Sequence, residues 1–194
     1  MKATLVTPPA FEPVTVAELK EHLRVDSTNE DSLIERLIVD ARETVEAWTR
    51  RAIITQTWEY FLYCFPGRNY IELPFGNLQS VTSVKYKDSN AVETTMTVNT
   101  DYIVESNSEM HGRIVLPYGD VWPTLSFYPS KPITIRFVCG WTTRALVPER
   151  IKQSIKLICA ERFENRGESV IGQTVVPNKA AENLIMPLRL WGNF

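Results

Sequence analysis

The stretch "WTRRAIITQTWEYFLYCFPG", residues 48–67, marks a change in the pattern of apolar residues along the chain. Before it, apolar residues recur every three or four positions, as on one face of a helix. After it, they alternate or run together in short groups rich in β-branched and aromatic residues, as in strands. The stretch therefore predicts that a helical segment passes into a sheet here. We call residues 48–58 the helix–sheet seam, with Trp48, Arg50, Arg51 and Trp58 as its candidate residues.

Upstream of the seam, the sequence predicts two helices. Thr15 and Glu18 have the spacing of a capping box, and Leu19 and Leu23 then share one helical face. A second start near Ser27 and Thr28 opens a longer helix that carries acidic residues in its first turn. Its apolar stripe consists of Ile34, Leu37, Ile38, Ala41, Val45 and Trp48.

Downstream, residues 55–140 form short strand-like runs separated by turn-forming residues. Helical spacing returns at residues 147–167, and residues 178–194 close the chain with a short helix and an apolar tail. The predicted fold class is therefore α+β. We expect a mainly helical bundle built from residues 1–54 and 141–194, with an antiparallel β-rich module, residues 55–140, inserted between them.

Composition limits the possible functions. The chain has 194 residues, of which 44% are hydrophobic and 23% charged, as in an ordinary soluble globular protein. Its net charge of -2 argues against a general nucleic-acid binder. Three widely spaced cysteines without a C-x-x-C pair fit reduced thiols better than a disulfide framework. The first residues lack an apolar signal-peptide core and no apolar run is long enough for a membrane span, so no membrane partner is expected.

Charge is unevenly distributed along the chain. Residues 1–54 carry 7 basic and 10 acidic side chains, residues 55–140 carry 6 and 8, and residues 141–194 carry 8 and 5. An acidic front and a basic back could pair between neighbouring copies of the chain. Solvated faces with local helix pairs are the commoner arrangement, and the sequence favours them.

No pattern in the sequence indicates catalysis. His22 and His111 are the only histidines, and neither has a second ligand at zinc-like spacing. We expect no enzymatic activity, no cofactor and no metal, and we expect Cys159 to be a buried thiol. Two alternatives from other classes are a small hydrolase that uses acids such as Glu59, Glu72 and Asp101, and a helix-turn-helix regulator. The acidic first segment disfavours the regulator.

The apolar C-terminal segment, residues 178–194, either packs on the chain's own core or docks on a partner. Its apolar side chains are too many for a free tail in water, and either arrangement would bury them. Pro187 would end the short helix, and Arg189 could bind a partner carboxylate. The candidate docking residues are Leu184, Ile185, Met186, Leu188, Arg189, Leu190, Trp191 and Phe194.

Five blocks, taken in order, resemble the head–tail connector (adaptor) proteins of long-tailed bacteriophages and related gene-transfer particles. The resemblance begins at Pro13-Val14-Thr15 and "AELKEHLRVD" and continues through "LIERLIVDARETVEAWTRRAIITQTW". It includes "LQSVTSVKY", "VPERIKQSIKLICAERFENR" and the closing "LIMPLR". The blocks span nearly the whole chain, and the departures, such as Val16 where leucine is common, are modest.

This resemblance implies a structural role in the virion neck, with assembly in the host cytoplasm. Such proteins form a ring, expected to be a dodecamer, beneath the portal protein. Their C-terminal region reaches the portal, so the resemblance implies that residues 178–194 dock there. The ring extends the DNA channel and provides a platform for stopper or tail proteins, and double-stranded DNA passes through it without specific binding. A ring requires a head-to-tail interface that closes on itself. The alternative within the same class is another neck protein, such as a stopper or tail-completion protein.

Overall fold

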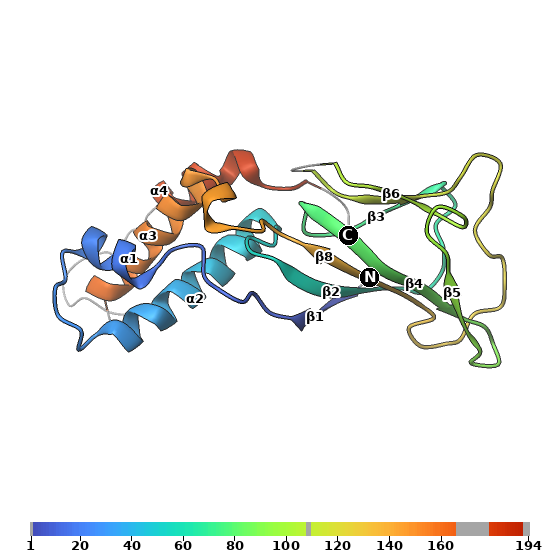
Figure 1. Cartoon of the computed structure of the whole chain (residues 1–194), viewed down its shortest axis with the longest axis horizontal. Helices are drawn as coiled ribbons and strands as arrows, with labels where there is room; N and C mark the ends of the chain where they lie inside the picture. The colour runs from blue at the N-terminus through green and yellow to red at the C-terminus, as the bar shows by residue number, and fades with distance from the viewer. Residues whose placement is uncertain (1, 108–109, 166–178, 192–194) are drawn as a thin grey trace. The chain divides into compact units, whose positions relative to one another are not determined.

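The computed structural model describes residues 2–107, 110–165 and 179–191 (Figure 1). These residues divide into two compact units. The sheet unit consists of residues 2–9, 55–107, 110–140 and 190–191, and the helical unit of residues 10–54, 141–165 and 179–189. The chain therefore enters the sheet unit twice from the helical unit, at residue 55 and near residue 190.

Helices from both ends of the chain share one core in the helical unit. Their bounds are α1 (Val16–Leu23), α2 (Asp31–Thr49), α3 (Glu149–Glu164) and α4 (Lys179–Ile185), with short 3₁₀ turns η1 (Arg144–Leu146) and η2 (Met186–Leu188). Ile34, Ile38 and Val45 of α2 are buried there together with Ile151 and Ile155 of α3. Within each helix these residues are four or seven positions apart, so each helix turns one apolar stripe toward the shared core.

The helix ends show which local signals the fold uses. Thr15 and Glu18 form the predicted capping box: the Thr15 amide donates to Glu18 Oε2 at 2.7 Å, and the Glu18 amide donates to Thr15 Oγ1 at 3.2 Å. The expected cap of α2 at Ser27 or Thr28 is wrong, because α2 begins after Glu30 and has no side-chain cap. The same helix ends at Arg50, which has a left-handed φ of 55° and turns the chain out of the helix.

All strand pairs in the sheet unit are antiparallel. A five-stranded sheet has the order β1-β2-β8-β4-β5, and a three-stranded sheet has the order β3-β7-β6. The bounds are β1 (Lys2–Thr7), β2 (Gln56–Leu62), β3 (Tyr70–Glu72), β4 (Leu78–Lys87), β5 (Glu93–Met96), β6 (Ile103–Glu105), β7 (Arg113–Val115) and β8 (Ile133–Cys139). The central strand β8 alternates as its sequence predicts, with Ile133, Ile135 and Phe137 fully buried and Arg136 exposed.

A glycine permits one close approach inside the sheet unit. A Cβ atom at Gly112 would lie 2.4 Å from Cβ of Leu78, closer than two carbon atoms can pack. Leu78 is itself buried, so it has little room to move away. This position therefore requires glycine for lack of space.

The predicted α+β class is confirmed, but the emphasis on a mainly helical bundle is not. The described residues contain four α-helices and eight strands. Residues 1–9 were predicted to belong to the helical part, but Lys2–Thr7 form β1, which pairs with β2 of the sheet unit. Formation of β1 depends on pairing with a strand more than fifty residues away in the chain. Local periodicity in the sequence cannot predict such pairing.

Candidate assembly surfaces

The chain leaves the helical unit and returns to it at neighbouring points. In the helical unit, the Trp141 amide donates to the Ile53 carbonyl at 2.9 Å, and Ile54 and Trp141 form a parallel bridge. In the sheet unit, Gln79 Nε2 donates to Thr55 Oγ1 at 2.8 Å and to the Gly140 carbonyl at 2.7 Å. Each unit thus joins the outgoing and returning chain by its own hydrogen bonds.

The four seam residues have different environments. Trp48 is 38% exposed on α2, whereas Arg51 is buried and its Nε donates to the Leu188 carbonyl. Arg50 is exposed at the left-handed end of α2. Trp58 lies on β2, where its ring packs at 4.2 Å from that of Phe75 and its Nε1 donates to Gln56 Oε1 at 3.0 Å. The structure brings none of these four side chains together into a common site.

A buried arginine that the sequence analysis did not select organises the end of α2. Arg42 is 5% exposed and binds Glu12 through Nε at 2.8 Å and Glu46 through Nη1 at 2.7 Å. Burial opposes the charge of Arg42, but the carboxylates of Glu46 and Glu12 outweigh it and raise the pKa of the guanidinium. Glu46 also accepts the Ile53 amide at 2.8 Å, so this network fixes the chain just before it leaves the helical unit.

The basic C-terminal part and the acidic N-terminal part contact one another inside the helical unit. Arg162 of α3 binds Asp40 of α2 at 2.6 Å, and its Nη2 donates to Thr44 Oγ1 at 3.1 Å. Arg144 donates through Nε to the Glu12 carbonyl at 2.7 Å. Local pairing within one copy, which the sequence favoured, therefore accounts for part of the charge asymmetry.

The candidate docking residues do not form one exposed surface. Ile185 is 1% exposed in the helical core, and Leu184 and Leu188 pack against that core. Leu190 is 3% exposed in the sheet unit. Arg189 is half-buried. Among these residues, only Met186 at 47% and Trp191 at 74% present much apolar surface to solvent. Phe194 and Asn178, the first residue of the segment, lie outside the described residues.

A second apolar surface lies on the connection between β7 and β8. Residues 116–130 contain a single charged side chain, Asp120. Trp122 anchors this segment inside the sheet unit: its Nε1 donates to the Arg68 carbonyl at 2.8 Å and its ring stacks on Phe65 at 5.0 Å. Tyr118 is fully exposed and Val121 is 81% exposed beside this anchor. This segment was not among the sites predicted from the sequence, although its scarcity of charge over fifteen residues was a usable signal.

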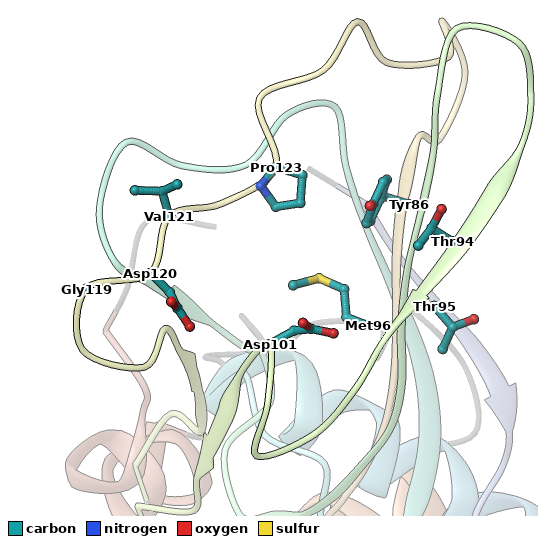
Figure 2. Close-up of a pocket in the computed structure, with 9 residues that line it drawn as sticks. All are labelled: Tyr86, Thr94, Thr95, Met96, Asp101, Gly119, Asp120, Val121 and Pro123. Atoms are coloured by element: carbon teal, nitrogen blue, oxygen red, sulfur yellow. The ribbon is translucent and has the colours of Figure 1, made fainter.

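A hollow of about 460 Å³ opens next to this connection. Its lining comes from β4, β5 and the loops around residues 101 and 120. Figure 2 shows Tyr86 and Pro123 at one end of the hollow and the carboxylates of Asp101 and Asp120 at the other. The Asp101 carboxylate accepts the Thr97 amide at 2.6 Å, so it stabilises a turn. The lining lacks any histidine, cysteine, lysine or arginine.

The candidate catalytic groups lie apart from one another. His22 is exposed on α1, and His111 is buried with its Nδ1 3.3 Å from the Leu73 carbonyl. Glu59 pairs with Arg136 and Glu72 with Arg113, on different sheets. Cys159 is buried as predicted, and burial raises the pKa of its thiol to about 12. Within the described ranges, no three His, Cys, Asp or Glu residues cluster as metal ligands.

Among the residues that the structure describes, no helix has both the length and the apolar character needed to cross a membrane.

The family model of the phage gp6-like head–tail connector protein matches residues 13–112, more than half of the chain. The chain belongs to this family. This connector is a structural protein of the head–tail junction, the virion neck. The family model ends before β7, so it does not include the β7–β8 connection or the C-terminal segment. No curated protein sequence is significantly similar to the connector.

Solved structures extend the likeness over the whole chain. The connector is similar to a chain in the virion of a native gene transfer agent particle, with 22% identity and a TM-score of 0.79. It is also similar to a chain in the neck of the empty particle, computed with C6 symmetry, with 21% identity and a TM-score of 0.80. A chain in the neck of the native particle, computed with C12 symmetry, is 21% identical with a TM-score of 0.75. Each match covers 100% of the connector and 98% of the other chain. The connector and these chains share one fold.

Proposed function

We propose that the connector forms a closed ring, a dodecamer, beneath the portal protein of a tailed phage or related particle. The ring extends the DNA channel and provides the platform to which stopper or tail proteins attach. The proposed role is assembly, without enzymatic activity or a cofactor.

The observation that carries this proposal is family membership. The full-length similarity to chains from gene transfer agent necks, one of them with C12 symmetry, agrees with it. A ring also needs two different surfaces that meet head to tail. The connector offers distinct exposed apolar surfaces at Trp48 of α2, at Tyr118 and Val121, and at Trp191.

We further propose that portal docking uses the exposed part of the C-terminal segment. Met186 and Trp191 are its most exposed apolar side chains, whereas Ile185 and Leu190 are buried within this copy. Burying an exposed tryptophan or methionine on a partner contributes about 1.5–3 kcal/mol each. The buried members of the segment instead hold it in place, as does the Arg51 hydrogen bond to Leu188.

Ring formation is tested by electron microscopy of the purified connector together with light scattering. The expected result is closed rings, in isolation or on addition of portal. A protein that stays monomeric and fails to bind portal particles contradicts the proposal.

Portal docking is tested with Trp191→Ser and Met186→Ser, measured by co-sedimentation with portal particles. We expect both to weaken portal binding while the melting temperature stays unchanged. Leu188→Ser is the matched control, because this side chain packs on the connector's own core and its loss should lower the melting temperature. Unchanged portal binding by the first two variants contradicts the docking proposal.

A further inference from the structure

One face of the five-stranded sheet is polar and carries a line of lysines. Strand register places one row of residues across all five strands: Lys2, Phe61, Thr134, Lys85 and Thr95. Lys87 lies two positions along β4, opposite Glu93, and so shares this face. Lys131 places its Nζ 4.4 Å from the centroid of the Phe61 ring, at the same end of the sheet. We call Lys2, Lys85, Lys87 and Lys131 the lysine strip.

The lysine strip is more positive than its own ion pairs can neutralise. Glu93 is the one acidic residue in its register, with Oε1 2.7 Å from Lys85 Nζ and Oε2 3.6 Å from Lys87 Nζ. Hydrogen bonding to Lys85 lowers the pKa of the Glu93 carboxyl, which keeps it ionised. Four lysines and one glutamate leave +3 on a chain whose net charge is -2. In the neighbouring row, Arg136 and Glu59 neutralise each other.

The backbone is strained where it supplies the fourth lysine. Lys131 has a φ of 48°, in the left-handed region, which costs about 1–2 kcal/mol for a residue with a side chain. Its side chain is exposed, and its ammonium group stands over the Phe61 ring. Residues held in such conformations often serve a function. Here the left-handed backbone conformation places the Lys131 ammonium group at the end of the lysine strip.

The side chains on this face indicate whether it suits a protein or a nucleic acid as its partner. The remaining side chains of its rows include the hydroxyl groups of Thr4, Ser83, Thr95 and Thr134. Phe61 is only 9% exposed, so it adds little apolar surface to this face. Protein interfaces have an apolar core, whereas nucleic-acid interfaces are polar and positive. Lysines and hydroxyl groups are also the usual contacts to phosphate oxygens.

We propose that the lysine strip contacts the phosphate backbone of double-stranded DNA without reading its sequence. Neighbouring strands are about 4.8 Å apart, so the strip extends roughly 14 Å from β1 to β4 and can meet three or four phosphates. The proposal deepens the proposed function, because it names the face of the connector that meets the DNA in the channel. Phosphate contacts carry no sequence information, in agreement with DNA that passes through without specific binding.

The test is fluorescence anisotropy with two labelled duplexes of unrelated sequence, titrated with full-length connector at several salt concentrations. The test variant is Lys85→Gln with Lys131→Asn, since asparagine tolerates the left-handed conformation. The matched control, Lys156→Gln with Lys179→Gln, changes the net charge equally but lies on α3 and α4. A third variant, Glu93→Gln, removes the acid that pairs with Lys85 and Lys87.

With four contacts, log Kd should rise with log salt with a slope of about 3.6, and the test variant should reduce that slope to about 1.8. The control should bind like the wild type, and Glu93→Gln should bind more tightly, a gain that misfolding cannot produce. Both duplexes should bind equally. Equal losses in the test and control variants would refute the proposal, as would preference for one duplex.

Electron microscopy of the same variants separates this proposal from the ring. Rings formed by the test variant, with weakened DNA binding, support it. If the test variant forms no rings but binds DNA as tightly as the wild type, the lysine strip contacts an acidic protein surface instead. That result would overturn the DNA proposal. Absence of rings in the wild type would contradict the proposed function, whereas the DNA measurement would still decide the lysine strip.

Discussion

Replacement of Arg42 by methionine should destabilise the helical unit more than loss of any surface ion pair. The Arg42 side chain is 7% exposed, and its partners Glu12 and Glu46 are 24% and 16% exposed. Removing one partner of a fully buried pair costs about 3–5 kcal/mol, because the remaining charge is stranded. Since both carboxylates here keep some contact with water, we expect about 2–3 kcal/mol for Arg42→Met.

The matched control is Arg162→Met, which also removes an arginine that pairs with α2. Arg162 and Asp40 are 36% and 58% exposed, so this change should cost about 0–1 kcal/mol. Urea unfolding followed by circular dichroism measures both. A slope of 1–3 kcal/mol per molar urea is typical, so a difference of about 2 kcal/mol corresponds to midpoints roughly 1 M apart.

A third variant identifies the cause of the loss. Combining Arg42→Met with Glu12→Gln and Glu46→Gln removes the stranded charges, while a glutamine at position 46 can still accept the Ile53 amide. This variant should recover more than half of the lost stability. The reasoning fails if Arg42→Met costs no more than Arg162→Met. It fails also if the triple variant recovers nothing, because the loss would then arise from packing.

Three further predictions concern the glycine contact, the thiols and the first helix. Gly112→Ala should lower stability by about 1–3 kcal/mol through overpacking, seen as a lower melting temperature, whereas Gly67→Ala, with nothing within 4 Å, should not. At pH 8 the native Cys159 thiol, with its pKa of about 12, should react with a thiol reagent more than about a hundredfold slower than exposed Cys64; comparable rates would contradict its burial. Hydrogen bonding to the backbone of Thr15 lowers the pKa of Glu18, so its contribution is present above pH 4.5 and is lost as the pH falls through the folded pKa. Glu18→Gln should therefore cost about 1 kcal/mol at pH 7 and progressively less as the pH falls below 4.5, as measured by chemical denaturation.

The contacts of the C-terminal segment could not be predicted from the sequence. Its apolar residues predicted burial, but not against which surface. Ile185 and Met186 are adjacent and both apolar, yet Ile185 is 1% exposed and Met186 is 47% exposed. The Arg42 network was equally hidden, because Glu12 lies thirty positions from Arg42 in the chain. Contacts of this kind depend on how helices meet, and no local pattern records that.

Elements whose hydrogen bonds are local could be predicted from the sequence alone. Thr15 and Glu18 cap α1 from three residues apart, and the apolar stripe of α2 follows helical spacing because a helix bonds only to itself. Alternation along β8 likewise revealed its two faces before any partner strand was known. These signals sufficed for the α+β class and, with the resemblance, for the family.

Which separate segments share a surface depends on contacts that are distant in the chain. Lys2, Lys85 and Lys131 come from distant parts of the chain and meet because β1, β2, β8 and β4 pair in one register. Shifting any of these strands by one residue would turn its side chains to the other face. Strand pairing is set by the burial of the opposite, apolar face, so the charge pattern of the polar face follows from nonlocal packing.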